Sequence, residues 1–373
     1  MTVPRLQQQR ERLTLTREQV AQTLGIPEQL LSLWERGDRN PGLYQLEQLA
    51  RLYRVNIGYL LGKEDLQERP TSDSAKVRFD RDREALRMQH RWLAFLDDWA
   101  EFLEDLEKMP VKAPLPLEEK DIATDSAPAL AAKVRQRYRL GMDALPDLSV
   151  FLDLQGVLVY RASLGKSLSG DFCNHPKLGC CILLNSDTTP GHQTFTLARE
   201  WFRSHEHPSN WDRTDFADTF AGHFLVPGDR LRWLVENARG RLDAYKALRL
   251  AAYFRTSYRC LLDRLREENL IPPEQYRQWS EYSSATMAAQ IGLDPSWFQV
   301  AGPPYLERYP VSVLEQVKEA IEDLELTPSQ AAGLLDLDVV TVQTKLLAKP
   351  PLATSVSDRP HGDLRNRVFA KNP

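Results

Sequence analysis

The segment "FTLAREWFRSHEH", residues 195–207, brings together charged and titratable side chains whose spacing could do chemistry. Arg199 and Arg203 are four residues apart, so on a helix they lie on one face, with Glu200 beside the first. Two histidines with this spacing would hold a zinc ion, and the glutamate would activate a metal-bound water. Arginine stays protonated and has no lone pair to offer, so it cannot ligate a cation. The spacing of a zinc site is therefore present without its ligands.

Two interpretations of this charged cluster remain open. In the first, Arg199 and Arg203 form internal salt bridges with Glu200, Asp215 or Asp218. In the second, the two guanidinium groups make a pocket for a small anion that carries a phosphate or carboxylate. We favour the first because the chain already supplies acidic partners, and two buried arginines without any partner would be very costly.

Histidines near this segment allow a further alternative. Four of the seven histidines of the chain fall in or near residues 192–227, namely His192, His205, His207 and His223. No two of them have the i, i+4 spacing of ligands on one helix, although His205 and His207 could converge at a frayed helix end. A relocated metal site stays an alternative, and surface or capping histidines are the simpler expectation.

The surrounding pattern predicts a small α+β domain over residues 115–235. The runs "ALAAKVRQRYRLG" and "LPDLSVFLDLQ" predict helices, and "GVLVYRA", "SLSGDFC" and "GCCILLNSD" predict short strands bounded by Gly and Asn. Helix returns at "QTFTLAREWFRSH" and at "DFADTFAGHFLVP". The first of these two helices carries the charged cluster, and the second carries its acidic partners.

This order of elements resembles the ImmA/IrrE-type metallopeptidase family. The matching stretches are "CILLNSD", "FTLAREWFR" and "ADTFAGHFLVP", and the helical segment at residues 256–272 resembles the one that follows in long members. The resemblance implies a zincin-like fold in which the HExxH motif is replaced by Arg199-Glu200-Trp201-Phe202-Arg203. It also implies a third ligand, a glutamate, near Asp215 or Phe216, where none stands. We therefore expect a pseudo-metallopeptidase with a vestigial Glu200, no catalytic residue, no metal and no cofactor.

Residues 5–62 predict a bundle of five short helices. Thr16 and Gln19 form a capping box, Gly25 ends the first of two central helices, and Pro27 opens the next at its first position. That second helix buries Leu30, Leu31 and Trp34 and stops at Gly37. Two short helices joined by a Gly-containing turn form a helix-turn-helix unit.

This bundle resembles the XRE-type helix-turn-helix family of DNA-binding regulators over its whole length. The resemblance rests on these landmarks: Thr16, Glu18, Val20, Ala21, Gly25, Trp34, Glu35, Gly37, Pro41, Leu46, Leu49, Ala50, Ile57, Leu60 and Leu61. It implies that residues 27–36 enter the major groove of double-stranded DNA. Base edges would be faced by Glu28, Gln29, Ser32 and Leu33, and phosphates by Arg17, Arg36, Arg39 and Asn40. Residues 1–63 hold nine Lys or Arg against six Asp or Glu, so a fold used only for protein contacts stays an alternative.

A long charged segment follows, and it predicts a linker helix over residues 76–110. Trp92, Leu96, Trp99, Leu103 and Leu106 are spaced by four, three, four and three residues, which is the heptad rhythm. The pattern covers only two and a half heptads, so it fits packing on the next domain of the chain as well as a dimer coiled coil. A homodimer would suit paired DNA half-sites.

The C-terminal third predicts helices over residues 236–349 and a polar, Pro-rich flexible tail over residues 350–373. Thr327 and Gln330 form another capping box, and "LTPSQAAGLLDLDVVTV" repeats the helix-turn-helix texture. Its second segment offers only Gln343 and Lys345 to DNA, so we favour a packing or dimerisation element over a second DNA-binding unit.

Composition sets the remaining limits. The net charge of −4 gives no global attraction to nucleic acid, no apolar run reaches the length of a membrane span, and the four cysteines form no CxxC pair. We expect a cytoplasmic, prokaryotic regulator, mainly α-helical, with domains at 1–65, 76–110, 115–235, 236–349 and a tail at 350–373.

The expected function is sequence-specific transcription regulation, with the peptidase-like domain as sensor, scaffold or partner-binding surface. Active relatives of the resembled family are associated with cleavage of XRE-type repressors, often in stress or mobile-element control, which makes such a role an expectation by analogy. The alternatives are a residual zinc metallopeptidase with displaced ligands and an antitoxin-like interaction module.

Overall fold

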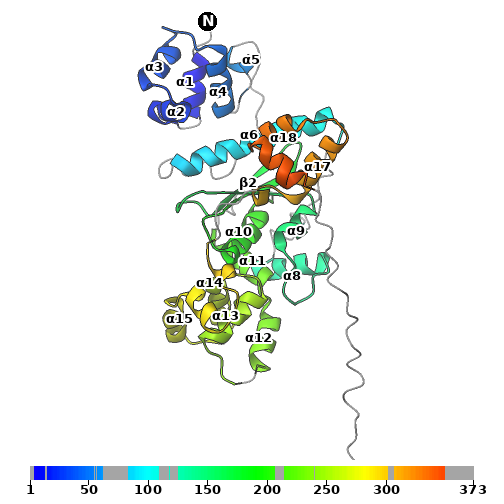
Figure 1. Cartoon of the computed structure of the whole chain (residues 1–373). Helices are drawn as coiled ribbons and strands as arrows, with labels where there is room; N and C mark the ends of the chain where they lie inside the picture. Colours follow the sequence, from blue (N-terminus) through cyan, green and yellow to red (C-terminus); the bar gives the residue numbers. More distant parts are fainter. Residues whose placement is uncertain are drawn as a thin grey trace, which may run out of the picture. The chain divides into compact units, whose positions relative to one another are not determined.

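A computed structural model shows a mainly helical chain with one small sheet (Figure 1). It describes residues 4–12, 15–53, 55, 57–61, 83–108, 117, 125–205, 214–238, 240–300 and 306–348. The chain divides into two compact units, residues 1–316 and 317–373. None of the helices in the described ranges has the length and apolar character needed to span a bilayer. The predicted fold class, mainly α with a small α+β middle domain, is confirmed.

Five short helices form the N-terminal bundle. They are α1 (Pro4–Arg12), α2 (Arg17–Leu24), α3 (Glu28–Arg36), α4 (Leu43–Tyr53) and α5 (Ile57–Leu60). The bundle has its own apolar core, which includes Val20, Leu31, Trp34, Leu49 and Leu60. Five-helix organisation is therefore confirmed, and the bundle is built around the residues that the periodicity indicated.

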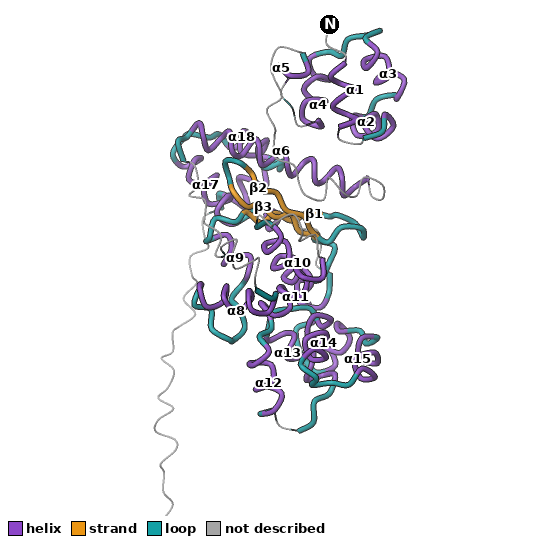
Figure 2. Tube along the Cα trace, turned by 180° about the vertical axis from the view of Figure 1, so that it is seen from behind, coloured by secondary structure: helices purple, strands orange, loops and turns teal. Residues whose placement is uncertain are grey.

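The middle of the chain is built on a three-stranded sheet. Its elements are α6 (Arg83–Asp105), α8 (Ala127–Arg137), α9 (Leu148–Asp153), β1 (Leu158–Ala162), β2 (Gly170–His175), β3 (Gly179–Asn185), α10 (Pro190–Arg203) and α11 (Thr214–Leu225). The strand order is β1-β3-β2, with β1 parallel and β2 antiparallel to β3. Helix α10 lies on one side of the sheet and α6 on the other, as Figures 1 and 2 show from opposite directions.

Side chains of β2 alternate between these two helices, as a pleated strand requires. Asp171 and His175 bond to α6, at Gln89 and Asp97. Asn174 points the other way and donates to the backbone carbonyl of Ser204 after α10. The middle strand β3 is buried from Cys181 to Asn185 because helices cover both of its faces.

Helices continue to residue 346. They are α12 (Gly228–Glu236), α13 (Ala244–Tyr253), α14 (Tyr258–Glu267), α15 (Pro273–Ser280), α16 (Ser284–Gln290), the 3-10 turns η2 (Pro295–Phe298) and η3 (Leu306–Arg308), α17 (Val311–Glu322), α18 (Pro328–Leu334), α19 (Val339–Thr341) and the π-helical turn η4 (Val342–Leu346). The capping box of Thr327 and Gln330 at the start of α18 is confirmed. Gln343 and Lys345 lie on the exposed side of η4. The predicted tail at residues 350–373 lies outside the described residues.

The thiols of the chain are free, and three of the four are buried. Cys173, Cys181 and Cys260 are buried, and Cys180 is half-buried beside Ser204. Burial raises the pKa of Cys180 and of Cys260 to about 12. At neutral pH these thiols therefore carry almost no thiolate, the reactive form.

Helix α6 packs within the single chain along the face that carries the heptad rhythm. Trp92, Leu96, Trp99 and Leu103 are all buried, and Phe95 stacks on Tyr160 of β1 with ring centroids 5.8 Å apart. These contacts support one of the two interpretations of the heptad pattern, namely packing on the chain's own domain. The dimer stays a prediction, and any seam would need other residues.

We predict that Trp99→Ala lowers the free energy of unfolding by about 3–5 kcal/mol, because it removes a large side chain that is 1 % exposed. Glu101→Ala, on the exposed side of α6, is the matched control and should change it by less than about 0.5 kcal/mol. Urea unfolding of the two variants and the parent protein measures both effects. Equal midpoints for the two variants would contradict packing of α6 on this domain.

Candidate functional site

The outward face of α3 is set by how the helix begins and ends. Pro27 is the N-cap residue and the helix starts at Glu28, one residue later than predicted, because Pro27 itself has an extended conformation with ψ of 139°. Gly37 ends the helix in the left-handed conformation, with φ of 82°, and its N–H donates to the carbonyl of Trp34. Leu31 and Trp34 are buried, while Leu30 is only half-buried. The opposite side of α3 therefore faces outward.

The preceding helix α2 is fixed by the predicted capping box. The N–H of Thr16 donates to Gln19 Oε1 at 2.7 Å, and the N–H of Gln19 donates to Thr16 Oγ1 at 3.1 Å. Helix α2 packs directly on α3. The local sequence thus positions the helix that was expected to enter the major groove.

Most residues predicted to contact DNA are accessible. The exposed ones are Glu28, Gln29, Arg36, Arg39 and Asn40, and the half-buried ones are Ser32 and Leu33. Arg36 forms an exposed ion pair with Asp38 at 3.1 Å. These side chains lie on α3 or within four residues of its C-terminal end.

Arg17 has a partner that the sequence did not reveal. Its Nε donates at 2.6 Å to Oε2 of Glu35, whose side chain is fully buried. Arg10 holds the other carboxylate oxygen at 2.5 Å, and this bond raises the pKa of Arg10. In the sequence, Glu35 is distinguished only as a landmark of the helix-turn-helix resemblance, next to Trp34. The pair of arginines explains why a glutamate is tolerated inside this small bundle.

The charged cluster on α10 has the predicted members in contact. Arg199 Nε donates to Glu200 Oε1 at 2.8 Å, and Arg203 Nη1 donates to Glu200 Oε2 at 2.8 Å. The side chain of Glu200 is fully buried. Burial raises the pKa of Glu200, and the two guanidinium groups partly offset that effect. Arg203 also lies over the ring of Phe172 on β2, at 5.5 Å.

The two predicted acidic partners on α11 differ in their placement. Asp218 Oδ1 lies 3.6 Å from Arg199 Nη1, and burial raises the pKa of Asp218. Asp215 is exposed, and among the described residues none forms an ion pair with its carboxylate. The charged cluster therefore consists of Arg199, Glu200, Arg203 and Asp218, and the exposed Asp215 makes no ion pair with it among the described residues.

Zinc does not fit these residues. Both positions that would carry histidine hold guanidinium groups bound to Glu200, and these groups repel a cation. Phe216, where the third ligand was sought, stacks on Phe202 with ring centroids 5.8 Å apart. Within the described ranges no group of three or more His, Cys, Asp or Glu could hold a metal ion.

The nearby histidines lie in separate environments. His192 Nε2 is 3.3 Å from Ser169 Oγ, and burial lowers its pKa, with a smaller contribution from Arg199. His205 is buried and bonds through Nδ1 to the carbonyl of Trp201 at 2.8 Å. His223 contacts Arg264 and Glu267 on α14. His207 lies outside the described residues.

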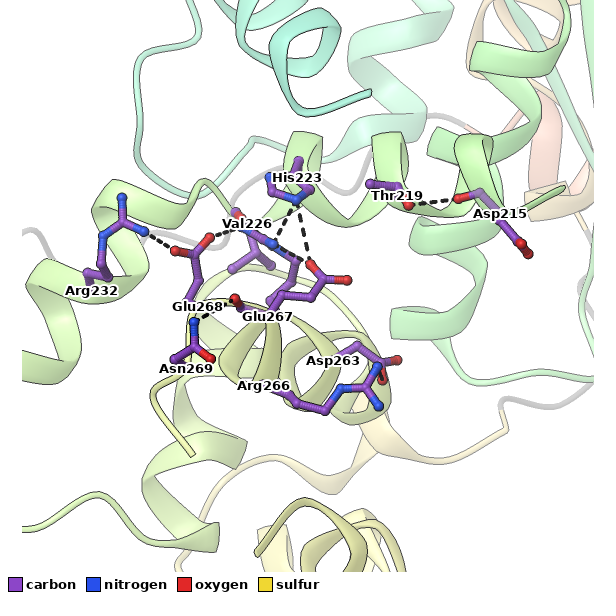
Figure 3. Close-up of polar contacts among 11 residues, drawn as sticks. Asp215, Thr219, His223, Val226, Arg232, Asp263, Arg266, Glu267, Glu268 and Asn269 are labelled. Atoms are coloured by element: carbon purple, nitrogen blue, oxygen red, sulfur yellow. Dashed lines mark hydrogen bonds and ion pairs between the residues drawn. The ribbon is translucent and has the colours of Figure 1, made fainter. Parts of the chain in front are cut away.

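A second polar cluster, which sequence reasoning missed, joins α11 and α12 to α14 (Figure 3). The buried guanidinium of Arg264 bonds to the carbonyl of Val226, to His223 Nε2 and to both Glu267 and Glu268. Arg232 holds Glu268 from α12. The i, i+3 and i, i+4 spacing within "RLREE" was the available signal. Beside this cluster, a cleft of about 260 Å³ is lined mainly by α11 and α14.

We predict that Glu35→Gln lowers the free energy of unfolding by about 3–5 kcal/mol, because it leaves two arginines without their buried carboxylate. Asp38→Asn breaks the exposed pair with Arg36 and should cost less than about 1 kcal/mol. Thermal or urea unfolding of both variants provides the comparison. A loss in Glu35→Gln no larger than in Asp38→Asn would show that the buried pair does not hold the bundle together.

Comparison with known proteins finds relatives of both the N-terminal bundle and the middle domain. Residues 6–60 match the helix-turn-helix family, and residues 152–266 match the IrrE N-terminal-like domain family. The HTH-type transcriptional regulator ImmR of Bacillus subtilis (strain 168) is 30% identical over 109 residues, which cover 29% of this chain and 84% of ImmR. The uncharacterized HTH-type transcriptional regulator YobD of the same organism is 40% identical over 65 residues, 17% of this chain and 58% of YobD. No solved structure matches the chain.

Two findings identify the family of the chain. The N-terminal bundle matches the helix-turn-helix family, and the alignment with ImmR covers most of the length of that relative. The chain belongs to the XRE-type helix-turn-helix transcriptional regulators and carries an IrrE N-terminal-like domain C-terminal to its DNA-binding bundle.

Proposed function

We propose that this regulator binds a specific DNA sequence by placing α3 in the major groove. The observation that carries the proposal is the accessible face of α3, where Gln29 and Glu28 are exposed while Leu31 and Trp34 anchor the helix. An exposed glutamine can bond adenine in two places, and a glutamate can accept from the amino group of cytosine. Base recognition by these two side chains is the function that this face supports best.

Phosphate contacts would come from the ends of the same two helices. Arg36, Arg39 and Asn40 are exposed at and after the C-terminal end of α3. Arg17 is 38% exposed although Glu35 holds its Nε, so its remaining N–H groups can reach a phosphate from a fixed position. A homodimer with two half-sites about one DNA turn apart completes the proposal.

For the IrrE-like domain, we infer a non-catalytic role as a sensor, scaffold or partner-binding surface. The supporting observation is the bond of both guanidinium groups, Arg199 and Arg203, to the carboxylate of Glu200. A glutamate held in this way cannot act as the general base of a peptidase, because its oxygens accept from permanent cations. The same bonds disfavour an anion pocket, since Glu200 and Asp218 already satisfy Arg199.

We predict that Gln29→Ala relaxes sequence preference at one base pair and weakens binding to the preferred site by about 1–3 kcal/mol, because it removes a base contact. The preferred site is first obtained by selection from a random DNA library with the full chain. Arg39→Ala, the matched control, should weaken binding to all sequences alike and reduce the slope of affinity against salt. Failure to enrich any sequence would favour the antitoxin-like interaction module instead.

We further predict that the purified protein contains no stoichiometric zinc by elemental analysis, because two guanidinium groups stand where ligands are needed. The double variant Arg199→His plus Arg203→His is the comparison, and any zinc it gains measures how well the site geometry suits a metal. Stoichiometric zinc in the parent protein would overturn the non-catalytic role and favour a metallopeptidase with displaced ligands.

A further inference from the structure

Two buried carboxylates lie on opposite faces of β2. Glu200 reaches this strand from α10, and Asp171 belongs to the strand and points toward α6. Both residues are fully buried. Burial is the main cause that raises the pKa of Glu200, and the negative charge of Asp171 adds to it from the other face of the strand.

Strand β2 approaches α10 very closely at Gly170. A Cβ atom added at Gly170 would lie 2.6 Å from Thr196 Cγ2, 2.9 Å from the carbonyl oxygen of Leu183 and 3.5 Å from Glu200 Cγ. Only glycine allows so close an approach of β2 to α10. Gly170 therefore lies directly against the stretch of α10 that carries Thr196 and Glu200.

The same strand holds α6 by buried polar bonds on its other face. Gln89 Nε2 donates to Asp171 Oδ2 at 2.7 Å, and Gln89 is itself buried. His175 Nδ1 accepts the N–H groups of Lys177 and Leu178, which leaves the proton on Nε2, 3.4 Å from Asp97 Oδ1. The position of α6 thus depends on where β2 places two polar groups of the same face, Asp171 and His175.

We propose that β2 transmits the state of the Arg199–Glu200–Arg203 cluster to α6, through Gly170 and the Asp171–Gln89 hydrogen bond. In sequence, α6 is the first described element after the DNA-binding bundle. A ligand or partner that draws one arginine away from Glu200 leaves the buried carboxylate with only half of its compensating charge, and β2 must adjust. The adjustment weakens the hold of Asp171 on Gln89 and loosens α6. This inference rests on the proposed function, because it takes the arginine cluster to be the resident state of the site.

Hydrogen–deuterium exchange of the full chain tests the coupling without knowledge of the ligand. Glu200→Gln removes the charge that holds both arginines. We expect exchange of α6 amides, residues 83–105, to rise by about tenfold relative to the parent protein. Arg203→Gln, at a residue whose side chain is 30% exposed, is a milder variant with the same expected direction if Glu200→Gln fails to fold.

Glu268→Gln is the matched control. Its carboxylate is also largely buried and also held by two arginines, Arg232 of α12 and Arg264 of α14, but it lies at the C-terminal end of α14. It should raise exchange in α14 and leave α6 unchanged. An equal rise of α6 exchange in Glu268→Gln would overturn the proposal, because the effect would then be global loosening. Unchanged α6 exchange in Glu200→Gln would overturn it as well.

The route through Asp171 has its own test. Gln89→Met keeps the shape of the side chain and removes the hydrogen bond, so this single substitution should itself raise α6 exchange. Adding Glu200→Gln to it should then produce little further rise, because the link is already broken. Independent, multiplicative effects would overturn the route. Zinc in the parent protein would refute the proposed function separately, since the exchange experiment makes no use of metal content.

Discussion

The pairing of one buried carboxylate with two guanidinium groups determines what the IrrE-like domain can do. Glu200 is fully buried, and a charge in that position is stable only with partners of opposite sign and good geometry. In a zinc site of this type a divalent cation stands near the glutamate. Here Arg199 and Arg203 supply two positive charges from the helix itself, within hydrogen-bonding distance. The positive charge beside Glu200 thus comes from two arginines, and neither of them can act as a Lewis acid.

Among the described residues, two other carboxylates are each held by two arginines in the same way. Glu35 is held by Arg10 and Arg17 in the N-terminal bundle, and Glu268 by Arg232 and Arg264 between α12 and α14. Arginine suits such sites because its planar fork offers several donors in fixed directions, which a lysine does not. Each trio joins elements that are distant in sequence or rigidifies one helix face. Pairs between charged residues thus contribute, together with apolar contacts, to how the helices of this protein pack.

Features that depend on neighbouring residues were predictable from the sequence. The capping boxes of Thr16 and Thr327 and the helix stop at Gly37 follow from spacing alone, and all three form as expected. Strands were predictable because Gly and Asn bound short apolar runs. The members of the α10 cluster were predictable because helix geometry brings positions 199 and 203 to one face.

Features that depend on contacts between distant segments were not predictable in the same way. The heptad rhythm of α6 could not tell a dimer seam from a helix packed on a sheet, because both need the same apolar stripe. Asp215 and Asp218 are residues of the same type on the same helix, and only the orientation of α11 brings Asp218 to Arg199. Arg17 looked available for phosphate because nothing local indicates its bond to Glu35, eighteen residues away.

In the proposed non-catalytic role, the IrrE-like domain influences DNA binding through a difference in free energy between two states of the protein. A ligand that interacts equally with both states shifts nothing, however tightly it binds. The arginine trio provides a place where such a difference can arise, because separating its charges in a buried site is far more costly than separating an exposed pair. The element that shares β2 with this trio is α6, held there by Gln89 and Asp97. On the proposed coupling, the arginine trio is therefore the place where binding energy reaches, through β2, the first described helix after the DNA-binding bundle.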